Sequence, residues 1–173
     1  DMKGMFSSAE SFNQPLDFNT ENVTTMSTMF FEARSFNQPL NFDTKNVTDM
    51  SCMFYEAGSF NKPLNFNTTK VTNMESMFFE AKSFNQPLNF TNTEKVTNMT
   101  KMFYRAISFN QPLNFNTLNV TKMVTMFCYA ESFNHALNFN TENVTNMNGM
   151  FYWAESFNQP LDLSLIHISE PTR

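Results

Sequence analysis

Apolar residues follow two alternating patterns along the chain. From Met26 to Ala33 they stand at positions i, i+3, i+4 and i+7, which is the spacing of one face of an α-helix. In the segment Pro-Leu-Asp-Phe-Asn at residues 15–19, the Leu and the Phe alternate with polar residues, as in a short strand that is buried on one side. The pattern therefore predicts a short helix and a short strand close together.

Both patterns return as an internal repeat. The motif Ser-Phe-Asn-Gln-Pro-Leu, with small variations, recurs with its Phe 24, 24, 24, 25, 24 and 24 residues apart, and a fixed period in this range is typical of a solenoid. The single insertion lies near Thr91. We assign residues 1–10 to a partial repeat, 11–155 to six full repeats and 156–162 to a further partial repeat.

One copy of the repeat is too small to bury its own apolar face. Neighbouring copies must therefore share hydrogen bonds and apolar surface, and we expect strands of successive copies to pair in parallel about 4.8 Å apart. The predicted fold class is an α/β solenoid, a curved rod with one short strand and one short helix per 24-residue repeat and a parallel sheet.

An asparagine follows the motif Phe in all seven copies. A column of amides, one per copy, can satisfy backbone groups that a buried bend would leave without hydrogen bonds. We interpret this column as a structural Asn ladder and not as a set of catalytic groups. The ladder consists of Asn13, Asn37, Asn61, Asn85, Asn110, Asn134 and Asn158.

Residues 163–173 break the repeat. They read LSLIHISEPTR and look like a translated sequencing adapter, so we interpret them as non-native and leave them out of the fold prediction. The chain also begins without Met. We therefore expect it to be a fragment of a longer protein.

Composition narrows the classes of function. The 173 residues include 11 basic and 16 acidic ones, for a net charge of -5, which opposes binding to phosphates and predicts no nucleic-acid partner. The two His and two Cys lie far apart in the sequence, so we predict no metal and no other cofactor. The chain contains no run of about 18 apolar residues of the kind that spans a membrane.

The sequence offers no convergent pair of catalytic residues, such as a nucleophile beside a base. His135 replaces the Gln of the motif, and we interpret it as a surface substitution. Cys52 and Cys128 lie three repeats apart, about 14 Å at the strand spacing, and should be free thiols because a disulfide needs Cα atoms within about 7 Å. We predict no enzymatic activity, unless a catalytic domain lies elsewhere in a longer protein.

The repeat as a whole reads S-F-N-Q-P-L-N-F-N-T-x-N-V-T-x-M-x-x-M-F-x-x-A. It resembles the surface-protein repeat of the BspA-like group, found in mycoplasmas, other bacteria and some protists, from Met2 to about Asp162. Phe18 and its equivalents stand where that group often has Trp. The resemblance implies a leucine-rich-repeat-like solenoid on an exported or surface-anchored protein, located at the cell surface or outside the cell and sometimes linked to adhesion.

The first candidate binding surface is polar. The residue between the Leu and the Phe of each predicted strand points away from the core, and on a curved solenoid such a surface is usually the concave recognition face. The alternative is a solvated sheet face without a ligand. The candidate binding face consists of Asp17, Asn41, Asn65, Asn89, Asn114 and Asn138, flanked by Asn19, Asp43, Asn67, Asn116 and Asn140.

The second candidate surface is aromatic and follows the buried Phe of each predicted helix. It lies about 140° from the centre of the apolar stripe, so we expect it to be at least partly exposed. It either binds a partner or another copy of the chain, or it packs edges of adjacent helices together. The candidate aromatic stripe consists of Phe31, Tyr55, Phe79, Tyr104, Tyr152 and Trp153, with Cys128 as an interruption.

The sequence thus predicts a non-enzymatic repeat module for adhesion that binds a protein or a glycan. The alternative is a purely structural spacer that displays another domain on the cell surface. We also expect self-association through the ends of the solenoid, because solenoids need polar capping repeats to stay soluble.

Overall fold

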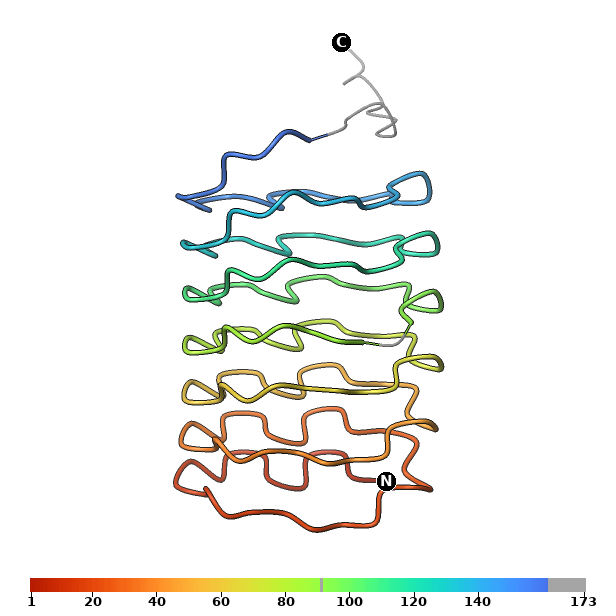
Figure 1. Cartoon of the computed structure of the whole chain (residues 1–173), viewed down its shortest axis with the longest axis vertical. Helices are drawn as coiled ribbons and strands as arrows, with labels where there is room; N and C mark the ends of the chain where they lie inside the picture. Colours follow the sequence, from red (N-terminus) through yellow and green to blue (C-terminus); the bar gives the residue numbers. More distant parts are fainter. Residues whose placement is uncertain (91, 162–173) are drawn as a thin grey trace.

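The computed structural model describes residues 1–90 and 92–161, in which the chain winds into a stack of coils. Each coil corresponds to one repeat, and the coils follow one another along the long axis (Figure 1). Hydrogen bonds join residues 22 to 26 positions apart at each step of the stack. The predicted repeat period is therefore confirmed, whereas the interpretations of Thr91 and of residues 163–173 concern parts of the chain outside the described residues.

The predicted helices are wrong. Within the two described ranges the chain forms no helix, and segments such as 26–33, here called the turn segments, consist of consecutive turns. In this segment every second N–H group, beginning at Met29, donates to the carbonyl three residues back at 3.1–3.2 Å. The N–H groups in between donate to the next coil, as Phe30 does to the oxygen of Met53 at 2.9 Å. It follows that no described segment is a helix long and apolar enough to cross a membrane.

Left-handed residues explain why the helical pattern does not produce a helix. Thr28 and Glu32 have φ angles of 54° and 55°, and a turn whose third residue has positive φ closes after four residues. Two such turns in succession direct positions i, i+3, i+4 and i+7 to the core, as one face of a helix would. An α-helix bonds its N–H groups to its own carbonyls, whereas the turn segments keep half of theirs for the neighbouring coil.

The predicted parallel sheet is also wrong. The described residues contain no strand, and the extended segments, residues 15–19 and their equivalents, are joined by one isolated bridge, between Leu64 and Leu88. The proline at the start of each segment, absent in one copy, has no N–H group to donate. Successive Phe rings of the segments from Phe66 onward lie 5.9–6.5 Å apart, more than the spacing of about 4.8 Å between paired strands. The remaining parallel bridges form one column just before the turn segments: Thr25–Asp49, Asp49–Asn73, Asn73–Asn98, Asn98–Lys122 and Lys122–Asn146.

Stacked phenylalanine rings form the core. The Phe of each turn segment stacks on its equivalent in the next coil with ring centroids 5.5–5.7 Å apart. The Phe of the Ser-Phe-Asn motif forms a second column at 5.9–6.0 Å, and the two columns contact each other at 4.1–4.4 Å. Methionine and alanine side chains of the turn segments, together with the valine that precedes each segment, complete this core and are buried in the central coils.

Candidate binding surfaces

The asparagine after the motif Phe links each coil to the next. The Oδ1 atom of Asn85 accepts a hydrogen bond from the backbone N–H of Asn110 at 2.9 Å. The same bond recurs at every step from Asn13 to Asn158, at 2.9–3.0 Å. These side chains are therefore occupied by bonds between coils.

The motif glutamine adds a second bond to this Asn ladder. Nε2 of Gln111 donates to Oδ1 of Asn85 at 3.0 Å. His135 stands at the same position in the next coil, and its Nε2 lies 3.2 Å from the backbone oxygen of Asn110. His135 thus contacts the backbone in the place of a glutamine. In residues 1–90 and 92–161, no three His, Cys, Asp or Glu side chains come together as a metal site would require.

All six residues of the candidate binding face are exposed. Within this column, Asn89 donates to Oδ1 of Asn65 at 3.5 Å. The flanking residues behave differently, because their side-chain oxygen accepts from the N–H two residues on, as Asn116 does from Leu118 at 3.1 Å. The column of the face therefore presents its amides to solvent, while the flanking column stabilises turns. The same turn bond occurs at Asn19, Asp43, Asn67 and Asn140.

The aromatic stripe is a stack of rings. Successive rings from Phe31 through Tyr55 and Phe79 to Tyr104 lie face to face, with centroids 4.3–4.6 Å apart and interplanar angles of 2–12°. Tyr55 and Phe79 each carry a ring on both faces, so their faces are closed to a ligand that must stack on them. The stripe accordingly packs neighbouring coils together in its central part, although not as edges of helices.

The stack breaks where Cys128 replaces an aromatic residue. Tyr129 stands one position later and meets Tyr104 at 68°. It lies almost parallel to Trp153 at 6.2 Å, whereas Tyr152 meets both edge-on. Tyr152 and Trp153 are each 57% exposed. Both residues belong to the last described coil, which has a neighbouring coil on one side only among the described residues.

The comparison with known protein families decides the assignment of the chain. Three overlapping segments, residues 1–89, 40–136 and 64–165, match a family described as "Mycoplasma protein of unknown function, DUF285". Together they span nearly the whole sequence. The chain belongs to the DUF285 family. No curated protein and no solved structure matches it.

The two thiols of this DUF285 chain are free. Burial is the largest cause that raises the pKa of Cys52, and the charges of Glu75 and Asp49 raise it further. Burial also raises the pKa of Cys128. Both groups are therefore protonated at neutral pH, which makes them poor nucleophiles.

Sequence reasoning missed one surface of this DUF285 chain. The residue that follows the last alanine of each turn segment differs between repeats. In three successive repeats it is Arg34, Gly58 and Lys82, and no binding surface was predicted from this difference. In the structure this column lines a groove with two recesses. The two uncharged residues of this otherwise charged column, Gly58 and Ile107, are visible in the aligned repeats and are the signal that could have found it.

Proposed function

We propose that the chain is a non-enzymatic binding module of a BspA-like surface protein and acts in adhesion by binding a glycan or a protein. The observation that supports this proposal is the exposed column from Asp17 to Asn138, held in register by the hydrogen bonds between coils. Five of its six members are asparagines, whose amides both donate and accept hydrogen bonds. A location at the cell surface or outside the cell is part of the proposal and rests on the resemblance of the repeat.

Repetition compensates for weak single contacts. An exposed amide contributes little by itself, but an equivalent polar side chain recurs once in every coil. A linear ligand that lies along the stack contacts several of them at once, so each further contact is intramolecular and raises the overall affinity. A polysaccharide or an extended polypeptide has the shape to do so.

Changing Asn65, Asn89 and Asn114 together to Ala is expected to abolish this binding without unfolding the stack. The three side chains are exposed, so their loss should lower the free energy of unfolding by less than about 0.5 kcal/mol each. Binding is measured on glycan arrays and in adhesion assays with host cells. The matched control changes three exposed residues of another column, Thr69, Glu94 and Glu142, to Ala and should bind like the parent.

A purely structural spacer is the second candidate function. It is favoured by the amide ladder and the ring stacks, which hold neighbouring coils together without a ligand. Absence of any binding signal above background would support the spacer. An equal signal from the parent and from the Asn65, Asn89 and Asn114 variant would reject the polar face as the binding site.

A further inference from the structure

Lysines gather on one exposed side of the central coils. The residue before the valine of each full repeat is asparagine in four coils, but it is lysine at Lys70 and Lys95. In the next coil, Lys122 stands two positions after the valine, where the other coils carry threonine, aspartate or asparagine. All three lysines are exposed. They therefore form a short row across three successive coils.

A column of threonines accompanies these lysines. Each threonine directly follows the valine, and because the valine is buried, the residues on both sides of it point outward. The N–H and the Oγ1 of Thr97 both donate to the backbone oxygen of Thr72, at 2.9 and 3.2 Å. Thr121 makes the same two bonds to Thr97. The hydroxyl groups are therefore fixed, and their oxygens can still accept a hydrogen bond from a ligand.

The backbone beside these residues is held in register between coils. Parallel bridges join Asn73 to Asn98 and Asn98 to Lys122, directly after the threonine column. The same three coils therefore present their lysines and threonines side by side. We call this surface the basic face; it consists of Lys70, Lys95, Lys122, Thr72, Thr97 and Thr121.

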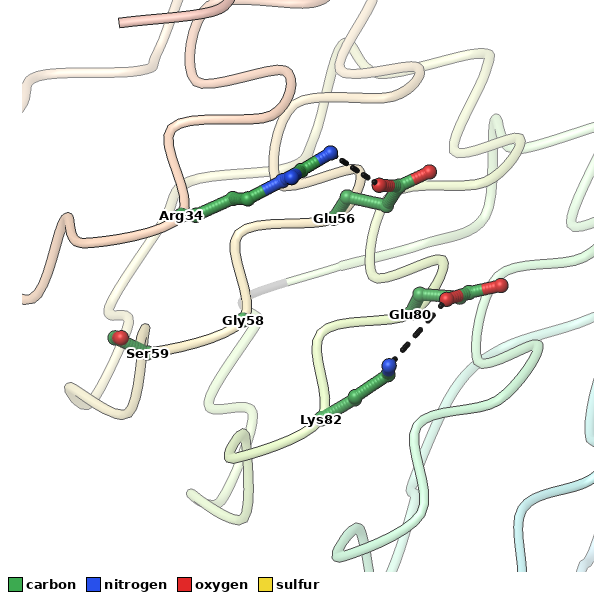
Figure 2. Close-up of a pocket in the computed structure, with 6 residues that line it drawn as sticks. All are labelled: Arg34, Glu56, Gly58, Ser59, Glu80 and Lys82. Atoms are coloured by element: carbon green, nitrogen blue, oxygen red, sulfur yellow. Dashed lines mark hydrogen bonds and ion pairs between the residues drawn. The ribbon is translucent and has the colours of Figure 1, made fainter. Parts of the chain in front are cut away.

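The lysines of the basic face have no acidic partner among the described residues. Figure 2 shows how basic residues elsewhere are paired, with Arg34 turned towards Glu56 and Lys82 towards Glu80. Every ion pair within residues 1–90 and 92–161 involves Arg34, Lys45, Lys82 or Arg105. The positive charge of the basic face is thus available to an anionic ligand.

The local charge differs in sign from that of the whole chain. Residues 70–122 contain six basic and three acidic residues, whereas the rest of the chain contains five and thirteen. The carboxylate nearest in sequence to Lys70 is that of Glu75, whose Oε2 accepts from Nδ2 of Asn98 at 2.9 Å. Because salt screens exposed charges that lie more than about 10 Å apart, an anion at the basic face interacts mainly with its lysines.

The chemistry of the basic face favours an acidic polysaccharide. Lysine is a compact point charge that binds carboxylate or sulfate groups without requiring a fixed geometry. Threonine oxygens accept hydrogen bonds, which the hydroxyl groups of a sugar can donate. The basic face contains no aromatic residue, whereas proteins that bind single-stranded nucleic acids stack the bases on aromatic side chains.

We propose that the basic face binds a linear acidic polysaccharide. Its carboxylate or sulfate groups contact Lys70, Lys95 and Lys122 in successive coils, and its hydroxyl groups donate to the threonine column. Because the ligand is linear, each contact after the first is intramolecular and raises the overall affinity. The proposal goes beyond the function proposed above, because it uses a surface separate from the polar column and does not depend on binding there.

The test measures binding of the full chain to fluorescently labelled heparin fragments by fluorescence anisotropy at low salt. Changing Lys70, Lys95 and Lys122 together to Gln should raise the dissociation constant about tenfold, because each exposed ion pair contributes only modestly. For the parent, the logarithm of the binding constant should fall with the logarithm of the salt concentration with a slope of about -2, as expected for three lysine contacts to a flexible polyanion.

A matched control removes the same charge elsewhere. Changing Lys3, Lys62 and Lys82 together to Gln alters the net charge equally and should leave heparin binding within about twofold of the parent. The Asn65, Asn89 and Asn114 alanine variant should also bind heparin like the parent, so a failure of the polar face leaves this proposal intact. Unlabelled neutral dextran should not compete.

Three results would overturn the proposal. The first is no binding of heparin at low salt, and the second is an equal loss of binding in the two glutamine variants, which would mean that only net charge matters. The third is an oligothymidylate that binds as tightly as heparin and depends on the same three lysines, which would make the basic face a site for polyanions in general, including nucleic acid.

Discussion

Replacing Phe78 with Ala is expected to lower the free energy of unfolding by about 3–5 kcal/mol. The ring is fully buried and stacks on Phe54 and Phe103 at 5.5 and 5.6 Å and on Phe84 at 4.2 Å. Its removal therefore takes away contacts with three other rings and leaves a cavity between coils. Urea denaturation followed by tyrosine and tryptophan fluorescence measures the change.

An exposed apolar residue provides the control for this substitution. Leu118 is 40% exposed, and Leu118→Ala should change the free energy of unfolding by no more than about 0.5 kcal/mol. Similar denaturation midpoints for Phe78→Ala and Leu118→Ala would contradict the view that continuous ring columns hold the coils together.

The second large effect is expected from Asn85→Ala, which should lower the free energy of unfolding by about 1–3 kcal/mol. The Oδ1 atom of Asn85 accepts from the N–H of Asn110 at 2.9 Å and from Nε2 of Gln111 at 3.0 Å. Alanine removes this acceptor, and the N–H of Asn110 then loses its partner at the junction of two coils. Thermal or urea denaturation of the purified variant gives the loss directly.

Asn89→Ala is the matched control, because it removes the same side chain four residues away on the exposed polar face. Asn89→Ala should lower the free energy of unfolding by less than about 0.5 kcal/mol. If both variants unfold at the same denaturant concentration, the distinction between a structural ladder and an exposed face is wrong.

The sequence identified the repeat and the buried positions but not the backbone conformation. Met26, Met29, Phe30 and Ala33 are all buried, as the pattern predicted. The same spacing is compatible with a helix and with two successive four-residue turns, so periodicity alone could not distinguish them. Only the φ angles decide, and nothing about the residue type of Thr28 favours a left-handed conformation. The hydrogen bonds to the next coil impose that conformation on it.

The candidate surfaces were predictable to different degrees. The exposure of the column from Asp17 to Asn138 followed from the alternation with Leu and Phe. The closed ring faces of Tyr55 and Phe79 did not, because stacking depends on how successive coils align and not on the order of residues within one coil. The groove at Gly58 depends on the difference between one coil and its neighbours, and a search for what the copies share overlooks it.

The most direct test of the turn segments compares two substitutions at Lys101. This exposed residue has a φ angle of 56° and lies in the middle of a segment that the sequence predicts to be a helix. In the left-handed conformation, glycine avoids a steric cost that alanine still has, so Lys101→Gly should be more stable than Lys101→Ala by about 1 kcal/mol. In a helix the order reverses, because alanine is favoured over glycine by about 1 kcal/mol. The measurement is the difference in the free energy of unfolding between the two variants in urea. A more stable glycine variant is the result expected here, and a more stable alanine variant would contradict a backbone made of turn segments.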